Sequence, residues 1–137
     1  MDIEEKQESA KLILQLYELR REQKMRESRD WWFGFNPKSI QDVMSAIMSP
    51  DGWKLRQAMG YWEMAAALVN HGVIDAQMFY DTNGEHLYLF VKLQPFLKEM
   101  RAAQPNTLLQ LEKLILGMPD AEKTIASVRQ QIEAWKR

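Results

Sequence analysis

The residue best suited to chemistry is a single glutamate in an otherwise apolar segment. Glu63 is the only charged residue between Ala58 and Val69. A carboxylate buried there must be protonated, hydrogen-bonded or paired, because an isolated buried charge is too costly. It could serve as a general base or as a metal ligand. The structural alternative, which we favour, is a carboxylate that pairs with Arg101 or Arg56, or that caps another helix.

Two histidines with acidic neighbours form the second group of candidate residues. His71 and His86 occur in the same stretch as three acidic residues, Asp75, Asp81 and Glu85. Imidazole and carboxylate groups are suitable ligands for zinc and other divalent metals. The spacing, however, contains no His-x-x-x-His and no Glu-x-x-His, and ligand-capable residues near two loops are common by chance. We therefore expect neither a metal nor another cofactor.

Other catalytic patterns have little support. The chain contains no cysteine, which excludes disulfides, thiolate zinc sites and cysteine nucleophiles. No serine lies in a Gly-x-Ser-x-Gly turn, and the six glycines occur singly, without the pattern of a phosphate-binding loop. The sequence leaves enzymatic activity open, favours a non-catalytic protein and supplies no catalytic residue that we would name.

An aromatic cluster is the other unusual feature. Trp31, Trp32, Phe33 and Phe35 place four large aromatic side chains within five residues. Such residues dominate protein interfaces and also hold proteins at membrane surfaces. They equally supply much of the area of a hydrophobic core, and this structural role is favoured for at least two of the four. The others are expected to contact a second subunit.

The first 30 residues are expected to form a long, protruding, charged helix. Eight acidic and seven basic residues lie in this range. The apolar residues from Leu12 to Leu19 spread over about 220° of a helical wheel, which is wider than one packing surface requires. A helix with this pattern contacts both the core and a second chain. Leu12, Leu16 and Leu19 are therefore predicted interaction residues, together with the four aromatic residues.

The remaining sequence, residues 31–137, is expected to form a helical bundle. A length of 137 residues and a mass of 16.1 kDa favour a single domain over residues 1–137. Apolar residues recur at helical spacing, which predicts an all-α, irregular bundle of six or seven helices. Methionines at the same spacing are expected to fill gaps in the core, among them Met44, Met48, Met59 and Met64.

Local signals conflict in residues 78–91. Asn83-Gly84 stands between two apolar segments, which is a strong β-hairpin signal. Against a hairpin, the apolar residues that follow continue at helical spacing. We favour a helix over residues 84–102 that is kinked at Pro95, because proline lacks the backbone donor that a helix interior needs. The hairpin remains the alternative.

The charge balance excludes one broad class of function. The chain has 18 basic and 19 acidic residues, for a formal net charge of −1. A general nucleic-acid binder needs surplus positive charge to displace phosphate counterions, so no nucleic-acid partner is expected. The N-terminal residues lack the basic start and apolar stretch of a secretion signal, and no apolar run reaches the ~20 residues that span a bilayer. We expect a cytoplasmic protein.

Three segments carry a family pattern: YWEMAAALVNHGVIDAQMFYD, LYLFVKLQPFLKEMR and LLQLEKL. The first segment contains the aromatic-Glu pair Trp62-Glu63 and a Gly-Val-Ile-Asp break at residues 72–75. The second contains Pro95 in a helix that ends at Arg101, and the third contains Glu112. In order and character, residues 12–116 resemble a bacterial family of small helical domains of unknown function. The resemblance implies an α-helical fold and leaves the function open. It also fits a buried polar network of Glu63, Arg101 and Glu112 that holds three helices in register.

The favoured function is therefore a non-catalytic one, protein–protein interaction or scaffolding. We expect a homodimer and an unidentified protein partner, with the first helix and the aromatic cluster as contact surface. One alternative is a small-molecule-binding protein or weak enzyme with a pocket near Glu63 and His86. Another is peripheral membrane association through Trp31–Phe35, which is less favoured because the charge balance gives it no electrostatic support.

Overall fold

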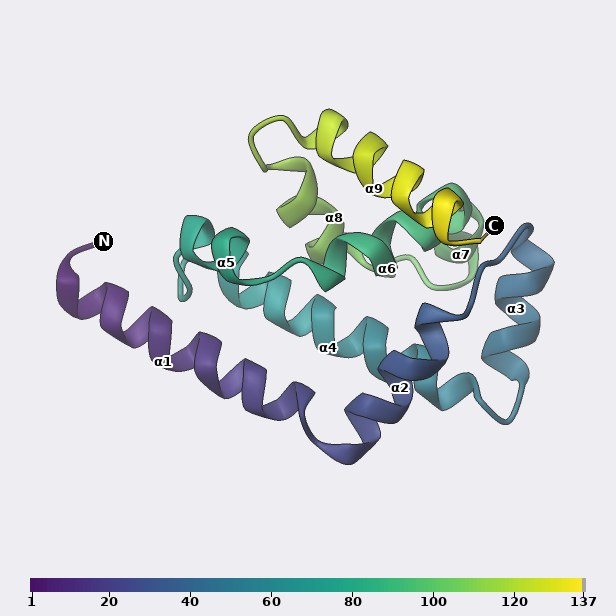
Figure 1. Cartoon of the computed structure of the whole chain (residues 1–137), viewed down its shortest axis with the longest axis horizontal. Helices are drawn as coiled ribbons and strands as arrows, with labels where there is room; N and C mark the ends of the chain where they lie inside the picture. Colours follow the sequence, from purple (N-terminus) through teal and green to yellow (C-terminus); the bar gives the residue numbers. More distant parts are fainter. Residues whose placement is uncertain (137) are drawn as a thin grey trace.

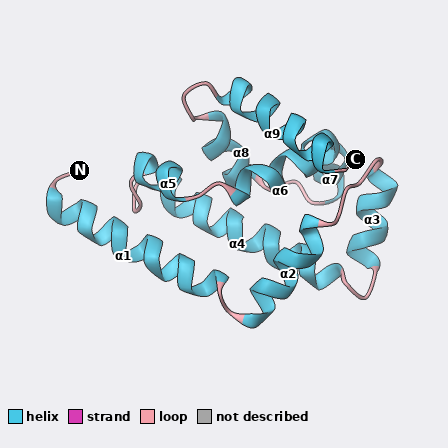
Figure 2. Ribbon diagram, in the orientation of Figure 1, coloured by secondary structure: helices cyan, strands magenta, loops and turns pink. Residues whose placement is uncertain are grey.

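The computed structural model describes residues 1–136, and every regular element in this part of the chain is helical (Figures 1 and 2). The prediction of an all-α fold is confirmed. The predicted number of six or seven helices is too low, because the first predicted helix is two helices and the helix containing Pro95 is interrupted. The described elements are α1 (Ile3–Arg20), α2 (Gln23–Phe33), α3 (Ile40–Met48), α4 (Gly52–Asn70), α5 (Ala76–Thr82), α6 (Glu85–Leu93), the 3₁₀ turn η1 (Gln94–Phe96), α7 (Leu97–Ala103), α8 (Leu109–Leu116) and α9 (Ala121–Trp135).

Helix α4 lies at the centre of the fold. It packs against α2, α3, α5 and α8, while α9 covers α6 and α8 on the far side (Figure 1). Its sequence explains this position, because apolar and small residues occur on several faces and allow neighbouring helices to approach. The helix ends at Asn70 with His71 as its C-cap, and Gly72 then adopts a φ of 81°, a conformation that favours glycine. The buried residues of α4 are Gly52, Leu55, Ala58, Tyr61, Trp62, Ala65, Ala66 and Val69.

The long N-terminal helix is confirmed only in part. The expected helix over residues 1–30 breaks at Arg21 and Glu22, and α1 and α2 meet there at an angle (Figure 1). The buried residues Ile13 and Leu16 of α1, and Met25 and Trp32 of α2, explain the break. On one straight helix the centres of these two buried faces would lie about 140° apart, at 100° per residue. The break allows both faces to pack inward.

Helix α1 is also tied down near its N-terminal end, which a fully protruding helix would not be. The fully buried hydroxyl of Ser9 donates a hydrogen bond to the carbonyl oxygen of Val73 at 3.3 Å. It accepts one from the backbone N–H of Asp75 at 3.0 Å. These bonds satisfy backbone groups in the connection between α4 and α5, so that α1 and this connection hold each other in place.

The segment with conflicting signals is helical. Asn83 and Gly84 separate α5 from α6, and the structure shows no strand anywhere in residues 1–136. Phe79 of α5 and Phe90 of α6 are buried in the core, so both flanking segments gain more from helical packing than a two-stranded ribbon would provide. The predicted interruption at Pro95 is confirmed as η1, after which the chain continues as α7.

The prediction that the methionines fill the core is wrong for several of them. Met48 of α3 is 82% exposed, and Met44 and Met64 are exposed as well. Helix α3 is short and lies at one side of the molecule, so that only one narrow face of it contacts α4 (Figure 1). Helical spacing alone identified the apolar residues but did not show which of them a neighbouring helix would cover.

The C-terminal end of α2 is held by a buried lysine. Lys92 of α6 donates to the carbonyl oxygens of Trp32 at 3.0 Å and Phe33 at 2.8 Å. The last carbonyls of a helix have no partner within the helix, and a cation there also interacts favourably with the helix dipole. Burial, together with the nearby positive charge of Lys136, lowers the pKa of Lys92 to about 8. Lys92 thereby joins the aromatic cluster to the bundle.

We expect Lys92→Met to lower the free energy of unfolding by about 1–3 kcal/mol, because two carbonyl oxygens would lose their charged donor. Urea denaturation followed by circular dichroism measures the change. Lys98→Met, at an exposed position of α7, is the matched control and should leave stability nearly unchanged. Equal stability of the two variants would show that the Lys92 bonds contribute little.

Candidate functional site

The carboxylate of Glu63 caps another helix. One oxygen, Oε1, accepts a hydrogen bond from the backbone N–H of Leu111 at 2.8 Å, and Oε2 accepts one from Gln110 at 3.0 Å. Both donors belong to the first turn of α8, where backbone N–H groups lack partners within the helix. A negative charge is also favourable at this end of a helix dipole. Of the interpretations that the sequence left open, the geometry is that of a helix cap.

Arg101 secures the chain just before the same helix. Its Nε donates to the carbonyl oxygen of Thr107 at 2.9 Å, and its Nη1 lies 3.2 Å from Oε1 of Glu112. Between these contacts, Leu108 has a φ of 52°, which is strained for a residue with a side chain. Within residues 1–136 no hydrogen bond or ion pair joins Glu63 to Arg101. The three residues of the predicted network therefore form two separate anchors on the start of α8.

We expect Glu63→Gln to lower the free energy of unfolding by about 1–2 kcal/mol, because an amide has one acceptor oxygen in place of two and carries no charge. Thermal and urea unfolding measure the effect. Glu27→Gln, at an exposed position beyond the first turn of α2, removes the same charge away from any helix start and is the control. An unchanged melting temperature for Glu63→Gln would contradict a stabilising role for this helix cap.

His86 is fully buried between aromatic rings. The centroid of its ring lies 5.4 Å from that of Trp62 and 5.2 Å from that of Phe79. Neither ring nitrogen has a hydrogen-bond partner among the described residues. Burial, with a smaller contribution from the positive charge of Arg20, lowers the pKa of His86 to about 4. The imidazole is therefore neutral near pH 7 and acts as part of the aromatic core.

The five predicted metal-capable residues do not form a metal site. Within residues 1–136 no three histidine, aspartate or glutamate side chains lie close enough together to hold an ion. His71 is exposed at the end of α4, whereas His86 is in the core. Asp75 caps α5 by accepting a hydrogen bond from the backbone N–H of Met78 at 2.9 Å. These side chains lie close together in the sequence, but the fold places them apart.

We expect His86 to make the protein less stable as the pH falls below about 6.5, the ordinary pKa of histidine in an unfolded chain. Between about pH 6.5 and about pH 4 the unfolded chain binds a proton that the folded chain does not, so stability falls with pH. Between pH 7 and pH 5 the protonation of His86 should lower the free energy of unfolding by about 2 kcal/mol.

Urea denaturation of wild type and His86→Phe at pH 7 and pH 5 tests this expectation. From pH 7 to pH 5 the free energy of unfolding should fall further in the wild type than in His86→Phe, by about 2 kcal/mol. His71→Gln, which removes the exposed histidine, should retain the wild-type pH dependence. The same loss in His86→Phe as in the wild type would contradict a neutral, buried His86.

The predicted interaction residues fall into three groups. Leu16 and Trp32 are buried within this chain, so they are not available to a partner. Leu12, Trp31, Phe33 and Phe35 are half-buried and pack against the core, with Trp31 stacked on Phe35 at 4.9 Å between ring centroids. Leu19 is 51% exposed. The aromatic cluster thus belongs largely to the fold, and of the seven predicted interaction residues only Leu19, on α1, is exposed.

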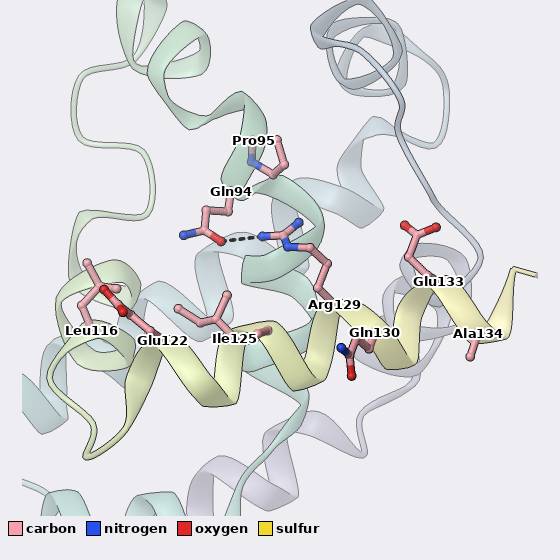
Figure 3. A pocket seen from close by; sticks show the side chains of 10 residues that line it. Gln94, Pro95, Leu116, Glu122, Ile125, Arg129, Gln130, Glu133 and Ala134 are labelled. Carbon is pink, nitrogen blue, oxygen red and sulfur yellow. Dashed lines mark hydrogen bonds between the residues drawn. The ribbon is translucent and has the colours of Figure 1, made fainter.

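A large, open hollow runs along α9 (Figure 3). Its volume is about 1030 Å³, and apolar groups such as Leu116 and Ile125 contribute to its wall. Arg129 points across it, but its guanidinium already donates to Oε1 of Gln94 at 2.8 Å (Figure 3). Neither Glu63 nor His86 lines this hollow. Its other polar lining residues are the exposed Glu122, Gln130 and Glu133.

A second, smaller hollow is lined by four of the seven basic residues in residues 1–30. It has a volume of about 240 Å³ and lies where α1, α2, α4 and the start of α6 meet. We call it the arginine cleft, and its charged residues are four arginines and one glutamate. Aromatic rings form much of the remaining wall. The lining residues are Tyr17, Arg20, Arg21, Met25, Arg26, Arg29, Trp32, Trp62 and Glu85.

Two of these arginines are held in place by Glu85. The Nε of Arg29 donates to Oε1 of Glu85 at 2.7 Å, and Nη1 of Arg20 lies 3.8 Å from Oε2. The guanidinium of Arg20 also lies over the rings of Tyr17 at 5.4 Å and Trp62 at 5.5 Å. Stacking and ion pairing together restrict these side chains before any ligand binds. The cleft is therefore a pre-organised, positively charged surface.

The sequence does not indicate this cleft. The spacing of Glu18 with Arg21 and of Glu22 with Arg26 is instead typical of ion pairs along a helix. The first pair forms, at 3.7 Å, whereas no ion pair of Arg26 occurs within residues 1–136. The available signal was the density of arginine itself, because arginine is the cation best suited to recognising anions.

The fold and these sites define a small all-helical domain whose polar side chains mainly fix helix ends. Within residues 1–136 no helix combines the length and apolar character that crossing a bilayer requires.

The chain belongs to the family described as Domain of unknown function (DUF4760), whose model matches residues 7–118. This range includes Glu63, His86 and the arginine cleft, and the resemblance noted in the sequence is confirmed. No curated protein and no solved structure matches the chain.

Proposed function

We propose that this protein is a non-catalytic interaction domain that pairs with a second copy of itself through α1. The supporting observation is a row of apolar side chains on this helix, which we call the α1 stripe: the exposed residues Ile3, Leu14 and Tyr17 and the half-buried Ala10. Ile3 is 69% exposed and Leu14 is 63% exposed. At 100° per residue the four positions fall within about 60° of the helix circumference, beside the buried face.

The distribution of charge on α1 favours a second copy of the chain as the partner. Residues 2–11 carry four acidic side chains and two basic ones, whereas residues 18–24 carry three basic side chains and two acidic ones. In an antiparallel pair related by a two-fold axis, the acidic end of each helix lies against the basic end of the other. Such complementarity sets orientation and suppresses the parallel arrangement.

This proposal keeps the helix that the sequence indicated but changes the contact residues. Leu16 and Trp32 face the core, and Leu19 lies on the other side of α1 from the stripe. Leu19 instead lines a separate hollow of about 340 Å³ with Gly60 and Met64.

A location in the cytoplasm, which the absence of cysteine suits, remains a prediction.

We expect the wild-type protein to be a dimer at micromolar concentration and Leu14→Glu to be a monomer, because the substitution places a charge in the apolar stripe. Sedimentation velocity with light scattering measures the mass of each. Met48→Glu adds the same charge at a more exposed methionine on α3 and should remain dimeric. A monomeric wild type, or a Leu14→Glu variant that still dimerises, would refute pairing through the stripe.

A further inference from the structure

We propose that the arginine cleft binds a small phosphate-bearing anion, either inorganic phosphate or a phosphate monoester. The proposal goes beyond pairing of α1 and does not depend on it. The α1 stripe and the cleft share Tyr17, and Arg20 and Arg21 of the cleft also belong to the basic end of α1. Arg26 and Arg29 belong to neither the stripe nor that end of α1.

The first argument is the supply of hydrogen-bond donors. Within residues 1–136, the side chains of Arg20, Arg21 and Arg26 donate no hydrogen bond to another protein group. Each guanidinium has five N–H groups in a planar fork that matches the oxygens of phosphate or carboxylate. Glu85 is the only carboxylate in the wall of the cleft, and Glu18 pairs with Arg21 at 3.7 Å from outside the wall. Arg21 and Arg26 are exposed, so their remaining N–H groups are available to a ligand.

The second argument is charge. Four positive charges and one negative charge line the cleft, although the whole chain has a formal net charge of −1. A phosphate monoester carries about −1.5 to −2 charges near pH 7 and offers three acceptor oxygens. It can therefore contact several guanidiniums at once, whereas a single carboxylate would repeat what Glu85 already provides. Positive charge in a concave, partly apolar site also concentrates anions from solution.

The third argument is size. The volume of about 240 Å³ is below the roughly 300–1,000 Å³ that is usual for sites of drug-sized ligands. A phosphate group with a small substituent suits this volume better than a nucleotide does. The rings of Trp32 and Trp62 form part of the wall and limit the access of water, which strengthens charge-assisted hydrogen bonds.

Isothermal titration calorimetry with inorganic phosphate and with glycerol phosphate tests the proposal, with sodium chloride matching ionic strength. We expect saturable binding to the wild type and about tenfold or greater weakening in Arg26→Gln. Arg26 has no side-chain bond in the described structure, so this variant should fold, as circular dichroism can check. Lys123→Gln, an exposed position of α9 that loses the same charge, should bind as the wild type does.

Binding that is equal in Arg26→Gln and wild type, or phosphate binding no stronger than that of chloride, would overturn the proposal. Leu14→Glu should bind phosphate normally, which separates this result from the test of dimerisation. Co-sedimentation with phosphatidic acid vesicles, but not with phosphatidylcholine vesicles, would identify a lipid headgroup as the source of the phosphate. Tighter binding of glycerol phosphate than of inorganic phosphate would identify a monoester.

Discussion

The indole of Trp62 is the contact on which the arrangement of this fold depends, because it joins α4 to three other helices. Its ring centroid lies 5.4 Å from that of His86 in α6 and 6.5 Å from that of Phe79 in α5. The guanidinium of Arg20, at the end of α1, lies over the ring at 5.5 Å. Large aromatic side chains contribute most to core energetics, and their faces attract cations. A single side chain therefore packs against an uncharged core and also forms a wall of the positively charged cleft.

This position of Trp62 separates two electrostatic environments that would otherwise conflict. His86 has no hydrogen-bond partner within residues 1–136, so a proton on its ring would be both unsolvated and close to Arg20. The lowered pKa of His86 avoids this conflict, because the neutral imidazole tolerates the arginine beyond the indole. Glu85, the neighbour of His86 in the chain, faces the other way and pairs with Arg20 and Arg29. His86 and Glu85, which are adjacent in α6, therefore belong to the core and to the cleft respectively.

The sequence predicted those features that depend on local signals and failed where distant elements meet. The all-α class and the interruption at Pro95 follow from residue type and spacing. The need for a partner of Glu63 could also be predicted, but its identity could not, because the partners are backbone N–H groups that any residue could supply. Lys92 gave no signal, since only the tertiary fold brings it to the end of α2. The break after α1 contains neither glycine nor proline, and only the shift in phase between the two apolar faces indicated it.

That break also explains how a chain with balanced charge obtains a strongly positive cleft. Arg20 and Arg29 are nine residues apart, so on one straight helix they would lie about 180° apart, on opposite sides. The break at Arg21 and Glu22 turns α2 relative to α1, and both guanidiniums can then reach the carboxylate of Glu85. The packing of Met25 and Trp32 fixes this turn, so the hydrophobic core determines where the arginines meet. Overall composition argues against binding a long polyanion, but it does not limit what a single concave site can bind once the fold has gathered its charges.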